Sequence, residues 1–180
     1  MSAAHLHVAL NHFPSIGAIV GFLLLLLARL IKNEGVELSG LAVLVLAAAL
    51  TIPTYFSGGE AEEIVEDQPG VTEQIIHEHE EAGEFGLIGG LVVGAVALFA
   101  LWKRKQTGKV PANLSLAVLV LSLAMAGIMV RVGLLGGHIN HPELRSDFVA
   151  AEGGGDDEGA AEGGESGESE DASESGESDG

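Results

Sequence analysis

Long apolar stretches alternate with short polar segments along the first 145 residues. A hydrocarbon core of about 30 Å takes about 20 helical residues at about 1.5 Å per residue. A run such as residues 21–27, which is Gly-Phe followed by five Leu, has no polar face to show to water. The pattern therefore predicts an all-α, four-helix transmembrane bundle in a lipid bilayer, with spans at about residues 13–31, 38–56, 85–102 and 114–139.

The polar segment between the second and third spans predicts two further helical pieces. Pro69-Gly70 breaks this segment, because proline and glycine favour turns. Before the break, residues 60–67 predict a short acidic helix. From Thr72 onward, a helix can run without interruption into the third span and stand above the membrane before entering it.

Basic residues predict the orientation of the bundle. Arg29, at the end of the first span, and Lys32 lie where the first two spans meet, and residues 103–109 carry four more bases between the last two. Because short loops rich in Lys and Arg stay on the cytoplasmic side, we expect both termini and the 57–84 segment to lie outside. We expect a multi-pass protein of a prokaryotic cell membrane.

Charge is segregated from the apolar residues. The chain is 47% hydrophobic yet carries a formal charge of −18, and its acids concentrate in residues 57–84 and 151–180, which contain no Lys or Arg. The second region is built from Gly, Glu, Ser, Asp and Ala, which bury too little apolar surface to fold. We predict a transmembrane domain over 1–148 and a disordered acidic tail over 149–180. The absence of Cys excludes thiol chemistry and disulfides, and the few bases argue against nucleic-acid binding.

The seven histidines all fall on the predicted outer side, and several share a depth. His7 and His79 each lie six residues before the first residue of a span, roughly 9 Å above the membrane, whereas His12 and His138 lie near its boundary. A low-spin haem b needs two imidazoles from different helices at matching height. We therefore expect a bis-His haem b near the outer face, with ligands drawn from His7, His12, His79 and His141.

Small residues form one face of the third span, at Gly83, Gly86, Gly90, Gly94 and Ala97. Such a face favours close helix packing, within one bundle or between copies in a homo-oligomer. Alternatively, its outer part leaves room for a flat prosthetic group.

Arg131 is the one formal charge inside a span and away from its ends, about 10 Å deeper than His138 on the same helical face. A long side chain at this depth can snorkel to the interface. The functional alternative is that Arg131 binds an anion of the cofactor, such as a haem propionate.

Four segments resemble a family. Residues 7–14 resemble the His-x-x-x-x-His-Phe-Pro opening of a domain-of-unknown-function family of prokaryotic four-helix membrane proteins. Residues 57–63, 79–82 and 136–143 look like its later signatures, so the likeness covers about residues 5–145. The family is similar to cytochrome-b-type bundles, which implies a haem. It points to His7, His12, His79 and His141 as shared imidazoles.

We expect a haem protein for electron transfer or redox sensing, working with a membrane or periplasmic redox partner, rather than an enzyme. Because no histidine lies on the inner side, the chain by itself carries at most one redox centre. One alternative is an outer-face site for a divalent metal ion, with ligands from His7, His12, His79, His138 and His141. The other is an accessory subunit of a membrane complex that binds nothing.

Overall fold

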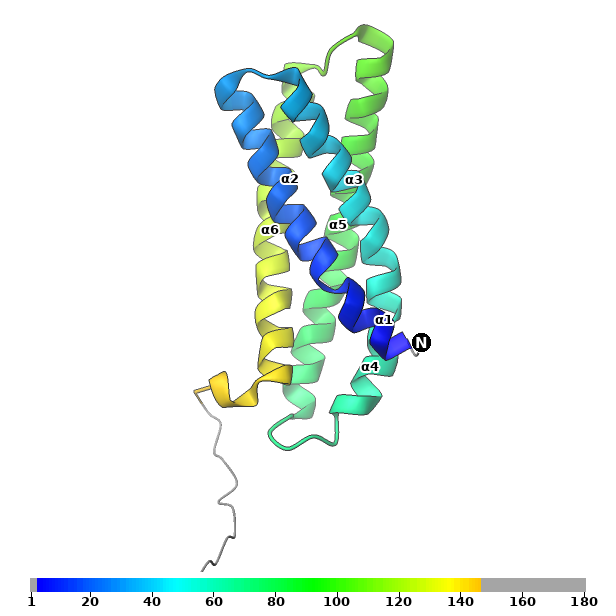
Figure 1. Cartoon of the computed structure of the whole chain (residues 1–180), viewed down its shortest axis with the longest axis vertical. Helices are drawn as coiled ribbons and strands as arrows, with labels where there is room; N and C mark the ends of the chain where they lie inside the picture. The colour runs from blue at the N-terminus through cyan, green and yellow to red at the C-terminus, as the bar shows by residue number, and fades with distance from the viewer. Residues whose placement is uncertain (1–2, 147–180) are drawn as a thin grey trace, which may run out of the picture. The chain divides into compact units, whose positions relative to one another are not determined.

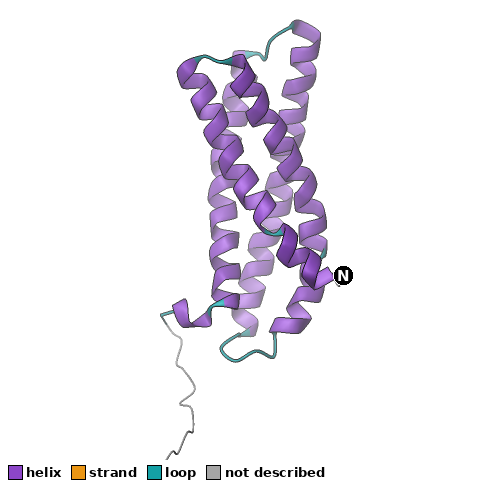
Figure 2. Cartoon of the chain, in the orientation of Figure 1, coloured by secondary structure: helices purple, strands orange, loops and turns teal. Residues whose placement is uncertain are grey.

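The computed structural model describes residues 3–146, and within them every regular element is helical (Figure 2). The predicted tail lies outside the described residues. The elements are α1 (Ala3–Leu10), α2 (His12–Ile31), α3 (Glu34–Phe56), α4 (Gly58–Val65), α5 (Glu73–Thr107), α6 (Ala112–Asn140) and the 3₁₀ turn η1 (Pro142–Leu144).

Four of these helices are long and apolar enough to cross a membrane, as predicted. Their most apolar windows have mean hydropathies of 2.1 to 2.3, and only 28% to 33% of each window is buried inside the bundle. Large apolar side chains consequently face outward, among them Leu30, which is 71% exposed, and Phe85, which is 66% exposed. An outer surface of large apolar side chains suits contact with the hydrocarbon core of a bilayer.

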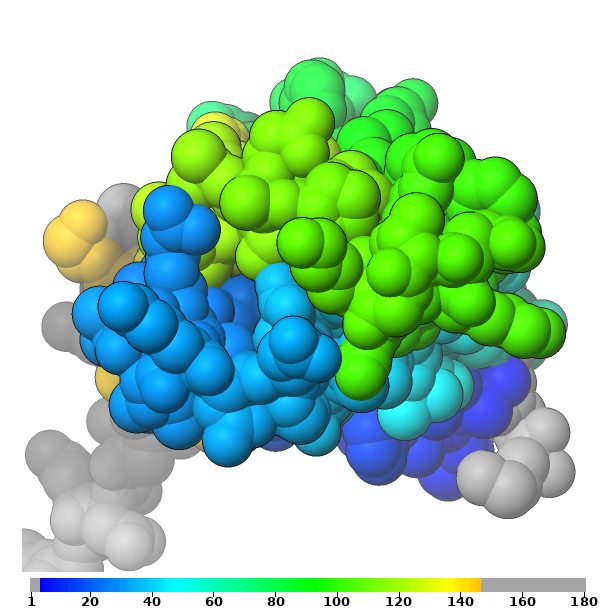
Figure 3. Space-filling model, turned by 90° about the horizontal axis from the view of Figure 1, so that it is seen from above, coloured from blue at the N-terminus to red at the C-terminus, as the bar shows by residue number. Residues whose placement is uncertain are grey.

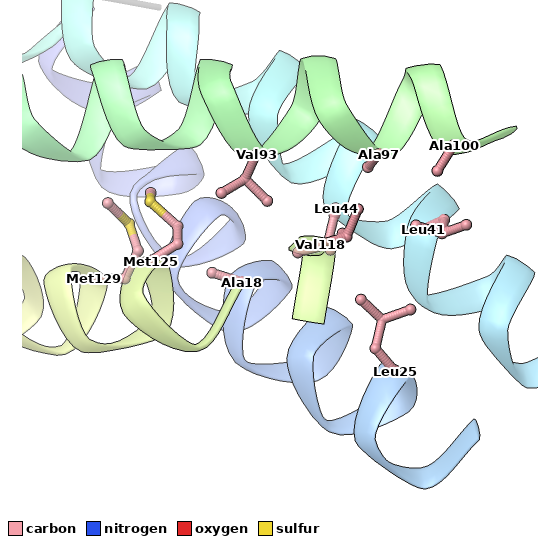
Figure 4. Packing of buried hydrophobic residues seen from close by; sticks show 10 residues of the cluster. All are labelled: Ala18, Leu25, Leu41, Leu44, Val93, Ala97, Ala100, Val118, Met125 and Met129. Atoms are coloured by element: carbon pink, nitrogen blue, oxygen red, sulfur yellow. The ribbon is translucent and has the colours of Figure 1, made fainter. Parts of the chain in front are cut away.

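The four long helices pack in a ring in the order α2, α3, α5, α6, each antiparallel to the next along the chain (Figure 1). Their shared core is apolar, and Leu41 and Val118 in it have no solvent exposure (Figure 4). The short helices α1 and α4 contact each other at one end of the bundle, where α5 begins and α6 finishes. We call this the α4 end.

The opposite end is closed by two tight connections that lie side by side in Figure 3. Asn33 caps α3, its Oδ1 accepting from the N–H of Val36 at 3.1 Å. Gly108 ends α5 with φ of 81°, a left-handed conformation that glycine adopts at little cost. Arg104 joins the two connections through an ion pair with Glu34 at 3.5 Å.

The small-residue face of α5 is mostly filled by its neighbours. A Cβ added at Gly86 would lie 2.5 Å from the Met129 side chain, and one at Gly90 would lie 3.3 Å from Thr51 Oγ1. Gly94 contacts Ala48 just as closely. The sequence allowed either close helix packing or room for a flat prosthetic group on this face. From Gly86 inward, the structure shows close helix packing. At Gly83 a Cβ would lie 3.9 Å from the nearest ring atoms of Tyr55, which is ordinary van der Waals contact, so this position is less tightly packed but is also covered.

A break at Asn11 separates α1 from α2. Pro14 has no N–H to give the carbonyl of Leu10, so the helical hydrogen-bond ladder is interrupted there. The break lets α1 leave the line of α2 and pack on α3 and α4 (Figure 1). Helix α5 also starts at the α4 end. Thr72 caps it, and it runs from Glu73 to Thr107 without interruption, in agreement with the helix expected from the sequence.

Candidate functional site at the α4 end

The elements of the α4 end carry all seven histidines. They lie on α1 (His5, His7), at the start of α2 (His12), on the first turns of α5 (His77, His79), near the end of α6 (His138) and at its C-cap (His141). The positions agree with the helix-end placement expected from the sequence, but the side chains have very different surroundings.

His7 is half-buried and hydrogen-bonded to the backbone of α3. Its Nδ1 lies 2.9 Å from the carbonyl oxygen of Thr54, which also accepts from the Ser57 hydroxyl at 3.0 Å. Because a carbonyl can only accept, Nδ1 carries the proton and donates. The ring also packs against the first residue of α4, since a Cβ at Gly58 would lie 3.6 Å from His7 Cε1. The lone pair of His7 therefore resides on Nε2.

His79 is half-buried against α6. A Cβ at Gly136 would lie 3.1 Å from its Cε1, so the glycine makes room for the ring. The ring hydrogen-bonds to the backbone of Val132, while its Nδ1 is buried and has no partner. Hydrogen-bonding Nε2 to a carbonyl leaves the lone pair on the buried Nδ1.

His79 lies six residues before Phe85, in the part of α5 that carries five carboxylates and precedes the apolar segment. There, burial lowers the pKa of His79, and a charge on His7 lowers it further. The hydrogen bond to Val132 and the nearby Glu80 act in the opposite direction but are smaller effects. His79 is therefore a neutral imidazole at neutral pH, which is the form that binds metals.

His7 and His79, which we call the pair, have similar hydrogen-bonding environments. Each comes from a different helix, each hydrogen-bonds to the backbone of a neighbouring helix, and each has one ring nitrogen without a hydrogen-bond partner among the described residues. Histidines that bind metals are almost always oriented in this way, through the N–H of the non-ligating nitrogen. A charge on His7 lowers the pKa of His79, so the two side chains are coupled electrostatically at the α4 end.

Asn11 adds an acceptor that the sequence reasoning missed. Its Oδ1 is buried without a hydrogen-bond partner. It lies one turn after His7 on the same helical face, because its N–H still donates to the His7 carbonyl at 2.8 Å. The spacing of four residues between His7 and Asn11 was the available signal. Buried polar atoms are nearly always satisfied in folded proteins, so this unpaired oxygen points to a missing donor or cation.

The remaining histidines do not join this pair. His12 is exposed, and His141 is exposed with its Nδ1 3.1 Å from Glu143 Oε1. His77 is exposed and lies 3.5 Å from Glu81. Within residues 3–146, no three side chains of His, Asp or Glu come together as a preformed metal site. The structure thus does not gather the four predicted imidazoles, although it does couple His7 electrostatically to His79.

Arg131 and His138 have no hydrogen bond or ion pair with His7 or His79 in the described part of the chain. Arg131 is exposed on α6, and its binding of an anion of the cofactor stays a prediction. His138 is half-buried in a surface groove of about 410 Å³ between the start of α5 and the end of α6. Other residues lining this groove include Gln74, Glu78 and Arg145.

A cavity in the middle of the bundle is too small to hold a prosthetic group. It measures about 10 Å³ and is lined by residues such as Pro14, Thr51 and Gly90. That volume suits at most one water molecule. A haem or another large ligand of the pair therefore does not fit into this cavity.

Carboxylates surround the site on its outer surface. Burial raises the pKa of Glu62 on α4, and a hydrogen bond with Glu80 on α5 together with repulsion from that group raises it further. Glu80 directly follows His79. This contact joins the short helix that packs on α1 to the helix that carries His79.

Comparisons of this chain with protein-family models, with curated proteins and with solved structures give no match. The resemblance based on residues 7–14 and the three later segments thus stays a prediction. The site has to be interpreted from its own geometry.

Proposed function

We propose that this protein is a multi-pass protein of a prokaryotic cell membrane that binds one haem b at the α4 end, on the outer side, for electron transfer or redox sensing. Its axial ligands are His7 and His79. The observation that carries the proposal is the carbonyl-anchored pair, in which each imidazole has one nitrogen fixed by backbone and the other without a partner.

The donor set of the site suits haem. A porphyrin supplies four nitrogen donors of its own, so the protein needs to add only two axial ligands. The pair provides two imidazoles from different helices, which is how helical bundles hold cofactors. A haem with both axial positions occupied supplies one-electron transfer without an open coordination site.

The residues around the pair perform three tasks in this proposal. The carbonyls of Thr54 and Val132 hold the rings and make them more basic ligands. Glycine at position 136 allows the backbone of α6 to approach the His79 ring closely. The exposed carboxylates of the neighbouring surface, such as Glu63 and Glu66, favour a redox partner with a basic docking surface.

The test is the pyridine haemochrome spectrum of protein purified in detergent after expression with ample haem. Wild type should contain one haem b per chain. His7→Ala and His79→Ala should each lose it, because each removes an axial ligand. His12→Ala and His141→Ala are matched controls that should keep it, since both side chains are exposed. Wild-type protein without haem, or equal loss in all four variants, would contradict the proposal.

A directly bound metal ion is the second candidate, and Asn11 favours it. Its unpaired Oδ1 would add an oxygen donor to the two imidazole nitrogens, and three protein ligands with one water complete a tetrahedral zinc-type site. Elemental analysis of purified protein separates the two candidates. Asn11→Ala should lower the content of a bound metal ion, whereas a haem held by His7 and His79 should survive that change. An accessory subunit that binds nothing would contain neither.

A further inference from the structure

Arg131 is a charge on the lipid-facing surface of the bundle. It is the only Asp, Glu, Lys or Arg between Ala112 and Asn140, and its side chain is exposed on α6. No hydrogen bond or ion pair joins it to another described residue. Charged residues within a membrane span usually face the bundle interior or a partner of opposite charge. An outward-facing arginine therefore needs an anion from outside the chain.

The surface around Arg131 is open. Gly127 lies one turn before it on the same face, and a Cβ at Gly127 would have no atom within 4 Å. His138 lies seven residues after Arg131, two turns further along that face. The flanking Val130 and Leu134 are exposed, at 49% and 59%. This face is consequently an apolar strip with two nitrogen donors along it.

Depth brings the two donors to one level. His138 lies at the predicted end of the fourth span, and Arg131 lies about 10 Å deeper. An arginine side chain extends towards the interface while its methylene groups stay in hydrocarbon. Its guanidinium therefore rises towards His138. His138 also lines the groove of about 410 Å³, which offers room for a polar head group.

The anion that lies at this depth in every bilayer is the phosphate of a phospholipid. The planar guanidinium of arginine matches phosphate with two parallel hydrogen bonds, which an ammonium cannot do. A second copy of the chain is a poorer occupant, because a two-fold contact through this face would place Arg131 against its own symmetry mate. Charge complementarity therefore selects a lipid.

We propose that Arg131 and His138 form a binding site for the phosphate group of one phospholipid in the leaflet around the α4 end. The site is separate from the His7–His79 pair. It assigns a role to two residues that the proposed haem site does not use. Glu78, which lines the groove and accepts from Gln74 at 2.9 Å, would face the head-group side of such a lipid and favour an amine there.

Native mass spectrometry of detergent-purified protein tests the site, using lipid mixtures with ethanolamine and glycerol head groups. Wild type should retain one phospholipid per chain. Arg131→Met should lower its occupancy by at least about tenfold, and Arg131→Lys should give an intermediate loss because the bidentate contact disappears. His138→Ala, a change at the helix end, should also weaken retention and gives a second readout if Arg131→Met fails to fold.

Two controls make the result decisive. Arg29→Met removes another exposed arginine at the opposite end of the bundle and should leave this lipid bound. Inorganic phosphate in excess should not displace it, since a free anion lacks the acyl chains that lie on the apolar strip. Unchanged retention in Arg131→Met, equal loss in Arg29→Met, or displacement by phosphate would overturn the proposal. His79→Ala should keep the lipid, so failure of the haem proposal is distinguishable.

Discussion

Replacing Gly17 by alanine tests the close packing that sets the position of α2 on α3. The added Cβ would lie 2.7 Å from Ala47 Cβ, and both atoms are fixed to helix backbones. Carbon atoms make favourable contact at about 3.5–4.0 Å, so the helices must separate locally by roughly 0.8 Å or more. Overpacking of this size costs about 1–3 kcal/mol. We expect Gly17→Ala to be destabilised by that amount after correction for helix propensity.

The Gly133→Ala variant measures the helix-propensity effect by which the Gly17→Ala result is corrected. Gly133 also lies within a long apolar helix, but a Cβ there would meet no atom within 4 Å. The gain in helix propensity from glycine to alanine is therefore common to both variants and cancels in their difference. Unfolding by sodium dodecyl sulfate in mixed micelles, followed by helical circular dichroism and by the fluorescence of Trp102, the single Trp, measures both. Equal stability of the two variants would refute the described α2–α3 packing.

Three further predictions concern the helix ends and the surface of the α4 end. Asn33→Ala should destabilise the protein by about 0.5–2 kcal/mol, because the cap of α3 is lost; the same unfolding assay measures this. Burial and Glu80 raise the pKa of Glu62, so the folded state binds this proton more tightly than the unfolded state does. The resulting stabilisation is fully present below the unfolded pKa of about 4.3 and is lost as pH rises through the higher folded pKa. Glu62→Gln should therefore gain stability relative to wild type as pH rises towards neutrality, and a pH-independent difference would contradict this. A membrane-impermeant maleimide should label Glu66→Cys in intact cells and Gln106→Cys only after permeabilisation; the reverse pattern would invert the proposed orientation.

Much of the fold is readable from local sequence. The four spans are continuous apolar runs, and the structure forms a helix over each of them. The helix expected from Thr72 into the third span is α5, and the expected acidic helix is α4, at Gly58–Val65. These features are predictable because backbone hydrogen bonding in a bilayer must be satisfied within each segment.

The sequence predicted only in part which residues belong to the candidate site. His7 and His12 look equivalent in the sequence, since both lie near the start of the first span. They are five residues apart, which points them to different sides of a helix, and the break at Asn11 turns α1 onto α3 and α4. His7 consequently packs inside while His12 is exposed. For Arg131 the sequence left snorkelling and anion binding open, because depth along a helix does not tell which way a side chain faces; the structure shows the side chain exposed.

The sequence by itself determined that this chain has four helices long and apolar enough to cross a membrane, with its histidines at one end, because apolar length and helix boundaries are local properties. Only the tertiary structure decided which imidazoles are held in place and which nitrogen of each has no hydrogen-bond partner. That depends on carbonyls of Thr54 and Val132, which lie 47 and 53 positions away from the rings they bind, on helices whose packing no local pattern specifies.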